Sequence, residues 1–372
     1  MRFASLPSSA AVNEALRGCG RPLRKLGDGV FGEEILCVEA GGDRLPAILI
    51  TAGTHSPEAA GVFAALRLVD EVETRHRVYI VPLRDPFGFN SFSHCMSVLG
   101  GRAVSIESHD DAVSWLEAVG SLVWREPRLL ISNVGEHSVA LLDSGEETQG
   151  WERAIERINE LFDERPEVQA ALLGRRVFIP PHTPTTEGTG RFGRTYTGVV
   201  DSEGKLLSLS QFFGRQEAPA EVACLEAFVR EIEPGITFDC HEDNYSQDFY
   251  IPARKLAGHE AESAELANAM LDAVADAGYP LADFDGFIRY HRQARPFWPP
   301  YQQPGSRPGL FWTDGLKRGI GYILTDFNLR FGYCMPTESP MEAPLAHRVE
   351  CHVRAVLAGV AKFETLAAAG LR

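Results

Sequence analysis

The pattern of apolar and polar residues predicts alternating strands and helices along most of the chain. Short apolar or β-branched runs, typical of strands, lie at residues 31–39, 47–52, 77–83, 129–134, 176–179, 235–241, 322–327 and 332–335. Helical periodicity marks residues 57–74, 111–122, 148–162, 218–232, 260–277 and 344–366. The strand, helix and strand between residues 47 and 83 predict parallel pairing, because such strands need a crossover connection.

A His and a Glu lie where the first of these strands turns into its helix. The strand ends in Ala52-Gly53-Thr54, and His55 and Glu58 follow it directly. Pro57 suits a first helical turn, because its missing N–H would have no partner there. Both side chains can therefore converge on one cation. The alternative is a solvated or capping pair, because this spacing is common in helical sequences.

Composition narrows the class of protein. The chain has 372 residues, 44% of them hydrophobic, which is ample for one large α/β domain or two smaller ones. A net charge of −15, with no long basic run among 36 Lys and Arg, argues against nucleic-acid binding. Seven scattered cysteines form no CxxC pair. No apolar segment has the length of a signal peptide or membrane span, so we expect a cytoplasmic protein without a membrane partner.

A second apolar strand also ends in polar residues that bind metals. The run 235–241 ends in Asp239, Cys240 and His241, and Glu242 follows it. Because parallel strands end at the same edge of a sheet, His241 is expected near His55 and Glu58. Two imidazoles and a carboxylate form the three-ligand set of a catalytic zinc site, which leaves a fourth position for water. Asp239 could orient a ligand from behind it.

A hydrolytic zinc site also needs a carboxylate that accepts a proton from water. Glu338 follows the strand-like run 332–335, again near a strand end. The alternative is that Glu338 caps the helix predicted after it, and spacing alone does not separate the two interpretations.

Three blocks of the sequence resemble the zinc carboxypeptidases of the carboxypeptidase A type, whose superfamily includes succinylglutamate desuccinylases and aspartoacylases. Residues 53–58 are similar to the family's Gly-x-His-x-x-Glu, residues 221–242 to a helix and strand ending in Asp-x-His, and residues 321–338 to the strand pair that ends in the catalytic Glu. The resemblance implies a single three-layer α/β/α domain with a mixed, mainly parallel sheet. We expect residues 1–28 as an N-terminal appendage and 29–372 as the catalytic domain, with elaborated loops at 91–215 and 292–318.

The resemblance also assigns roles to individual residues. It implies that one zinc ion per chain is bound by three ligands and that Glu338 is the general base and proton shuttle. It further places Arg191 or Arg194 as the arginine that stabilises the oxyanion, and Tyr322 on the substrate side. The three implied zinc ligands are His55, Glu58 and His241.

The chain departs from the family where carboxypeptidases grip the substrate's terminal carboxylate. An Asn-Arg pair does this in the family, but the matching segment, residues 209–213, carries Gln211 and no arginine. Arg215, four positions later, could replace it. We therefore expect a carboxypeptidase-like hydrolase that uses a zinc-bound water on a small peptide or amino-acid conjugate. An N-acyl amino acid deacylase of the desuccinylase kind and a catalytically silent zinc-binding module are the alternatives.

Overall fold

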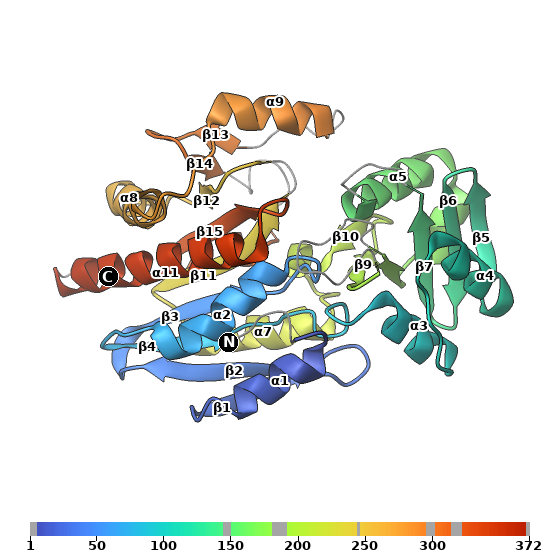
Figure 1. The fold of residues 1–372 in the computed structure, drawn as a ribbon, viewed down its shortest axis with the longest axis horizontal. Coiled ribbons are helices and arrows are strands. Elements are labelled where there is room, and N and C mark those ends of the chain that lie inside the picture. The colour runs from blue at the N-terminus through green and yellow to red at the C-terminus, as the bar shows by residue number, and fades with distance from the viewer. Residues whose placement is uncertain are drawn as a thin grey trace.

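The computed structural model describes residues 6–143, 150–180, 192–243, 246–294, 302–313 and 322–369. Arg191, one of the two arginines predicted to stabilise the oxyanion, lies outside these residues. Figure 1 shows the described chain with a main body and a second group of strands and helices beside it.

The main body is built on a six-stranded mixed sheet. Its strand order is β1-β2-β4-β3-β11-β15. The last four strands in this order run parallel to one another, while β1 and β2 pair antiparallel at one edge. The bounds are β1 (Leu23–Asp28), β2 (Glu34–Gly41), β3 (Arg44–Ala52), β4 (His76–Val81), β11 (Ile236–Asp243) and β15 (Tyr333–Pro340). A mixed, mainly parallel sheet is thus confirmed.

Helices cover both faces of this sheet, because its central strands are apolar on both sides. Ile48 and Ile50 of β3 pack into one core, whereas Ala47 and Leu49 pack into the opposite one. The first core also contains residues of α1 (Ser9–Arg17), α2 (Ala59–Glu71), α8 (Glu260–Asp276) and α11 (Leu345–Ala368). The second contains α7 (Ala220–Ile232), α10 (Leu324–Asn328) and the short 3-10 helix Leu209–Phe212. The three-layer α/β/α arrangement is confirmed.

The segment predicted as elaborated loops at 91–215 instead contains a second six-stranded sheet, ordered β10-β9-β8-β7-β6-β5. Its helices α3 (Phe92–Gly100) and α4 (His109–Val119) pack on one face, and α5 (Gly150–Glu164) and α6 (Pro166–Leu172) pack on the other. The strand predictions at 129–134 and 176–179 are confirmed, whereas the other four strands were not predicted, and two of these, β9 and β10, have only five and three residues. They are β5 (Ser121–Glu126), β6 (Leu129–Val134), β7 (His137–Leu142), β8 (Arg176–Ile179), β9 (Tyr196–Val200) and β10 (Leu206–Ser208).

Two smaller predictions are also wrong. Residues 322–327 were expected as a strand but contribute to the helix α10, which packs beside β15. Residues 23–28, placed in an N-terminal appendage, form the edge strand β1 of the main sheet.

A third sheet has the order β12-β14-β13, with β12 (Ile251–Ala253), β13 (Gln302–Pro304) and β14 (Leu310–Thr313), and α9 (Phe284–Ala294) precedes β13.

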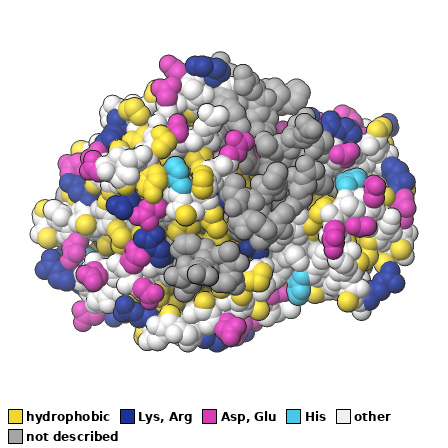
Figure 2. Space-filling model, in the orientation of Figure 1, with side chains coloured by type: hydrophobic (Ala, Val, Ile, Leu, Met, Phe, Trp, Pro, Cys, Tyr) yellow, Lys and Arg dark blue, Asp and Glu magenta, His cyan; other side chains and the backbone are white. Residues whose placement is uncertain are grey.

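Positive and negative side chains are mixed on the surface of the molecule. On the face shown in Figure 2, the described Lys and Arg side chains are scattered among Asp and Glu and form no continuous basic stripe. Among the described helices, none combines the length and apolar character needed to span a membrane.

Candidate metal centre

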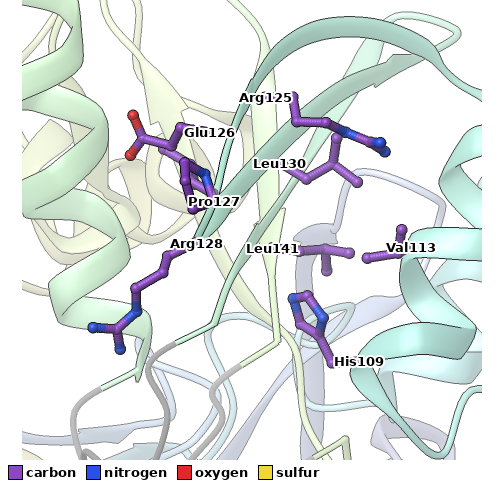
Figure 3. A pocket seen from close by; sticks show the side chains of 9 residues that line it. His109, Val113, Arg125, Glu126, Pro127, Arg128, Leu130 and Leu141 are labelled. Carbon is purple, nitrogen blue, oxygen red and sulfur yellow. The ribbon is translucent and has the colours of Figure 1, made fainter.

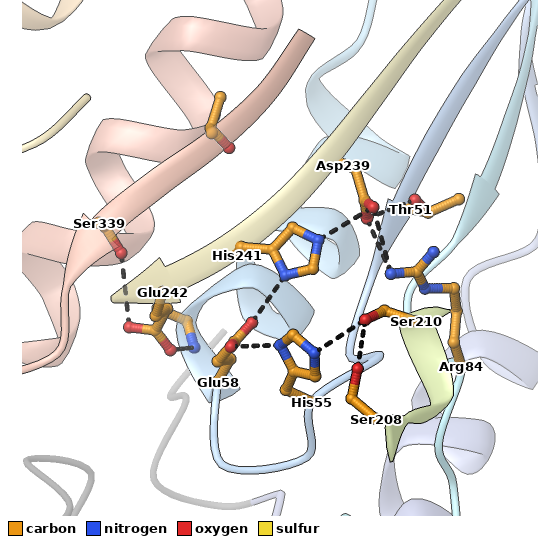
Figure 4. A network of polar contacts seen from close by, with 12 residues as sticks. Thr51, His55, Glu58, Arg84, Ser208, Ser210, Asp239, His241, Glu242 and Ser339 are labelled. Carbon is orange, nitrogen blue, oxygen red and sulfur yellow. Dashed lines mark hydrogen bonds and ion pairs between the residues drawn. The ribbon is translucent and has the colours of Figure 1, made fainter. Parts of the chain in front are cut away.

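Three side chains converge at the carboxyl ends of β3 and β11. His55 Nδ1 lies 2.6 Å from Glu58 Oε1, and His241 Nδ1 lies 3.0 Å from Glu58 Oε2. One ligand atom from each residue falls within 4.8 Å of the others. Figure 4 shows both imidazoles turned toward the same carboxylate. The predicted ligand set His55, Glu58 and His241 is therefore brought together in space.

Close packing of the turn and of helix α2 places Glu58 beside His241. Gly53 has a φ of 64°, and a Cβ there would lie 2.9 Å from side-chain atoms of Leu83 and Val62. Gly61, in the first turn of α2, approaches β11 so closely that a Cβ would lie 2.7 Å from the carbonyl oxygen of Cys240. These two glycines therefore let the strand, the turn and the helix meet at one point.

Another acid satisfies the start of helix α2, which leaves Glu58 free for the metal. Glu58 occupies the N-cap position, yet its side chain makes no capping hydrogen bond. The backbone N–H of Ala60 donates instead to Glu242 Oε2 at 2.7 Å, and Arg348 forms a buried ion pair with the same carboxylate. The alternative of a simple capping role for Glu58 is thus not what the structure shows.

The outer nitrogen of each imidazole has an acceptor. His241 Nε2 lies 3.0 Å from Asp239 Oδ2, and His55 Nε2 lies 3.3 Å from the Ser210 hydroxyl oxygen. A proton held on each Nε2 leaves the Nδ1 lone pairs for a cation. Two imidazole nitrogens and one carboxylate oxygen form a donor set that suits zinc. The residues present therefore fit the metal that the sequence predicts.

The charges around the triad favour an ionised Glu58. Burial alone would raise the pKa of this carboxyl, but the neighbouring His55 and His241 outweigh it and lower the pKa to about 2. Burial would lower the pKa of His241, whereas the carboxylates of Asp239 and Glu58 raise it well above the usual value. Without a cation, the surroundings of the triad thus favour an ionised Glu58 and a protonated His241.

Glu338 lies next to the triad, on the neighbouring strand. In the parallel pairing of β11 and β15 it is the register partner of His241, so both side chains lie on the same side of the sheet. Its backbone N–H and carbonyl bond to Tyr250, which fixes the strand end. Burial raises the pKa of Glu338 well above its usual range, and the charges of Glu58 and Asp243 add to this effect against the opposing influence of His241.

An arginine that the sequence did not single out also belongs to this network. Arg84 follows β4, and its backbone N–H donates to the carbonyl oxygen of Gly53 at 3.2 Å. Its Nη2 lies 3.1 and 3.2 Å from the two carboxylate oxygens of Asp239. The Thr51 hydroxyl donates to the same carboxylate at 2.8 Å. The only available sequence signal was its place directly after a buried parallel strand, where polar residues line crevices.

Arg194, predicted to stabilise an oxyanion, has a different environment. Its guanidinium is fully buried, lies 3.8 Å from the centre of the Phe89 ring and donates to the carbonyl oxygens of Pro7 and Phe89 at 2.8 and 2.9 Å. These contacts attach the N-terminal segment to the loop after β4. The structure therefore argues against the predicted catalytic role, because these backbone contacts occupy the guanidinium.

Arg215 and Tyr322, the two predicted substrate-side residues, contact each other. The Arg215 guanidinium carbon lies 4.5 Å from the centre of the Tyr322 ring, and its Nη1 donates to Asp201 at 2.8 Å. Gln211, in the segment that matches the family's Asn-Arg pair, accepts a hydrogen bond from the backbone N–H of Ser208 at 3.1 Å. Substrate binding by Arg215 and Tyr322 stays a prediction.

Two aromatic side chains from the second sheet and its helix α5 lie beside His55. Trp151, at the start of α5, and Tyr196, at the start of β9, stack with ring centres 4.3 Å apart. The His55 ring lies 5.6 Å from Trp151 and 6.1 Å from Tyr196. Ser210, the partner of His55 Nε2, lies in the short 3-10 helix that follows β10 of the same sheet. The candidate metal centre thus lies where the two sheets meet.

A separate cavity of about 490 Å³ lies between α4 and the β5–β6 hairpin and is lined by none of the candidate ligands (Figure 3). Its floor includes Val113, Leu130 and Leu141. Of its arginines, Arg125 pairs with Glu117 at 2.5 Å and Arg128 donates to the carbonyl oxygen of Asp143 at 2.6 Å. Because these charges have partners outside the cavity, it offers no comparable chemistry.

Comparison with known proteins gives structural likeness without sequence likeness. No protein-family model matches the sequence, and no curated protein matches it either. The structure of bovine thrombin-activatable fibrinolysis inhibitor in complex with tick carboxypeptidase inhibitor is 11% identical, with a TM-score of 0.50 and 100% of each chain covered. Carboxypeptidase A from Helicoverpa armigera is 10% identical, with a TM-score of 0.49 and coverage of 99% of this chain and 76% of that one.

A third similar structure, the metallo-carboxypeptidase from Burkholderia cenocepacia, is 10% identical, with a TM-score of 0.46 and coverage of 96% of this chain and 68% of that one. At such identities the likeness is one of fold. The chain has a carboxypeptidase-like α/β fold, and a His-Glu-His group that can hold a metal ion lies at the strand ends of its main sheet.

Proposed function

We propose that this protein is a zinc-dependent hydrolase of amide bonds, with a small peptide or amino-acid conjugate as substrate. The observation that carries the proposal is the convergence of His55, Glu58 and His241, with Glu338 in register beside His241. A triad alone would serve binding as well as catalysis. A half-buried acid next to the three ligands adds the proton acceptor that hydrolysis needs.

Each residue then has a defined task. His55, Glu58 and His241 would hold the zinc ion. Ser210 would accept the Nε2 proton of His55, and Asp239 would accept that of His241. When bound, zinc supplies Lewis acidity toward a carbonyl oxygen and lowers the pKa of water. Glu338 would take the proton of the attacking water and pass it to the leaving amine. Burial raises the pKa of Glu338 above its usual range and so favours its protonated form, which supports its carrying the proton between the two steps.

A deacylase of N-acyl amino acids is the second candidate. The segment that would hold a terminal carboxylate in a carboxypeptidase carries Gln211, whose side chain accepts from Ser208 N–H. Arg215 nearby is paired with Asp201 at 2.8 Å. Without an arginine at this segment to bind a peptide's terminal carboxylate, both peptides and N-acyl amino acids stay candidate substrates. A silent zinc-binding module is the third, and it has no chemical need for Glu338.

One experiment separates the three. Metal content of the purified chain is measured first, and amide release is then compared for free peptides, C-terminally blocked peptides and N-acyl amino acids. Release from free peptides alone supports the carboxypeptidase, and release from N-acyl amino acids alone supports the deacylase. Stoichiometric zinc without any release supports the silent module. Absence of stoichiometric zinc after zinc loading would overturn the proposal.

A further inference from the structure

A buried polar network lies on the face of the main sheet opposite to Glu338. Side chains alternate along β15, so Thr337 and Ser339 lie on the face that α2 and α11 cover, while Glu338 lies on the other. His352 of α11 contacts both hydroxyl groups, with Nδ1 2.8 Å from the Thr337 oxygen and Nε2 2.9 Å from that of Ser339. One imidazole therefore bridges the two residues that flank the proposed base.

The network continues from Ser339 to the start of helix α2. The Ser339 hydroxyl donates to Glu242 Oε1 at 3.4 Å, a contact drawn in Figure 4. Arg348 pairs with the same oxygen, and Oε2 of this carboxylate accepts the backbone N–H of Ala60. Ala60 comes two positions after the candidate ligand Glu58. The strand that carries the proposed base and the helix start beside a candidate ligand are thus joined by one chain of hydrogen bonds.

The direction of these hydrogen bonds follows from the single proton of each hydroxyl group. Ser339 donates its proton to Glu242, so its contact with His352 needs a proton on Nε2. A neutral imidazole then has an unprotonated Nδ1, which accepts the proton of Thr337. Burial is the main reason that the pKa of His352 falls to about 3, so the ring is neutral at pH 7. Both ring nitrogens thus have a partner in one defined orientation.

Apolar side chains could fill this place without the burial of polar groups. Met335, two positions before Thr337 on β15, belongs to the apolar core, and so do Val349 and Val353 on α11. A buried polar group is costly whenever a partner is missing, whereas a fully bonded network fixes one arrangement of the segments that it joins. The presence of His352 among these residues therefore favours a function in positioning over one in stability alone.

We infer that His352 is a positioning residue, which fixes through Thr337 and Ser339 the part of β15 from which Glu338 emerges beside His241. The inference rests on the proposed function, in which Glu338 takes a proton from the attacking water. A displacement of about 1 Å in such a centre can slow a reaction by about 10²-fold. His352 lies on the opposite face of the sheet and acts only through the strand.

Two substitutions remove one hydrogen bond each and change the shape of the core little. They are Thr337→Val and Ser339→Ala. On the zinc-loaded chain we expect each to lower kcat for amide hydrolysis by about tenfold or more, with KM within about twofold and the zinc content unchanged. His352→Phe, which keeps a ring without nitrogens, should lower kcat further. His352→Gln should recover part of kcat, because its amide can donate to Ser339 in place of Nε2.

Val360→Ala is the matched control. Val360 is buried in the same core and lies on the same helix, about two turns beyond His352. Its truncation should lower the melting temperature at least as much as Thr337→Val, because it leaves a cavity, but kcat should stay at the wild-type level. If Thr337→Val and Ser339→Ala lower the melting temperature and leave kcat unchanged, His352 is purely structural and the inference is wrong.

Infrared spectroscopy on the zinc-free chain makes failure of the inference distinct from failure of the proposed function. Each protein is compared with its own Glu338→Gln version, and the difference isolates the carboxyl band of Glu338, which depends on the surroundings of that group. We expect the band to shift in Thr337→Val and Ser339→Ala but not in Val360→Ala. A shift without any amide hydrolysis would keep the positioning by His352 and refute the hydrolase. An unshifted band would refute the inference, whether or not the chain hydrolyses amides.

Discussion

His241 and Glu338 are register partners on the adjacent parallel strands β11 and β15. Neighbouring strands lie about 4.8 Å apart, so the two side chains emerge side by side from one face of the sheet. This relationship places the candidate ligand His241 beside Glu338, the proposed proton acceptor, through the pairing of β11 and β15. The strand pairing, rather than a flexible loop, therefore fixes their distance.

Replacing Glu338 by Gln should abolish turnover and leave metal binding intact. The amide has nearly the same shape as the carboxyl but cannot accept the proton of the attacking water. We expect amide hydrolysis to fall by about 10²–10⁴-fold. Zinc content measured by mass spectrometry should stay at the wild-type level. Full activity in Glu338→Gln would remove Glu338 from the mechanism.

Loss of a triad member should instead remove the metal. Glu58→Gln takes away the one charged ligand, whose pKa of about 2 keeps it ionised at neutral pH. We expect this variant to lose zinc on dialysis, and zinc should no longer raise its melting temperature, because a ligand stabilises only a state that binds it. The exposed His94 on α3 offers a control, since His94→Ala should behave like the wild type. Equal zinc retention in Glu58→Gln would contradict the ligand assignment.

Zinc affinity should depend more on Asp239, the hydrogen-bond partner of His241, than on Ser210, the partner of His55. Asp239 is a buried carboxylate behind His241, whereas the Ser210 hydroxyl behind His55 is neutral. Asp239→Asn should weaken zinc affinity by about 10–100-fold, as losses of such supporting groups do. Ser210→Ala should cost less, because the hydrogen bond it removes carries no charge. Competition with a chelating dye measures both affinities, and a larger effect of Ser210→Ala would contradict this order.

Sequence alone could predict the candidate metal centre because its three possible ligands follow strong local patterns. His55 and Glu58 follow an apolar strand and precede a periodic helix, and His241 ends another apolar strand. Strand-end positions of this kind converge in a parallel sheet whatever the details of the loops. The three candidate ligands therefore followed from the strand and helix pattern, whereas the role of Glu338 came from the family resemblance, because spacing alone did not separate a base from a helix cap.

Other parts of the molecule could not be predicted, because they depend on contacts between distant segments. Arg84 and Asp239 are 155 positions apart, and no pattern near either one signals their pairing. Arg194 had a suitable position in the sequence, but only the fold shows that backbone carbonyls occupy its guanidinium. Two strands of the second sheet, at 129–134 and 176–179, were predicted, but the sheet as a whole was missed, partly because strands such as Leu206–Ser208 are too short to show an alternating pattern.

The stability of the protein should fall with acid partly because of His352. This side chain is fully buried on α11, with Nδ1 2.8 Å from the Thr337 hydroxyl oxygen and Nε2 2.9 Å from that of Ser339. Burial is the main reason that its pKa falls from 6.5 to about 3, and the charge of His241 adds to it. The native state therefore holds this imidazole neutral at a pH where the unfolded chain already protonates it.

The sign of the effect follows from proton binding. Between pH 6.5 and about 3 the unfolded state binds more protons at this residue, so its stabilising contribution is complete above pH 6.5 and is lost as the pH falls. The total lies on the order of 4 kcal/mol, with a slope of at most about 1.4 kcal/mol per pH unit.

We expect His352→Asn to be less stable at pH 7 but to show a shallower decline between pH 6 and about 4. Urea unfolding with a chelator present measures both slopes free of metal release. The exposed His94→Asn should keep the wild-type slope, and an unchanged slope in His352→Asn would show that other groups cause the acid sensitivity.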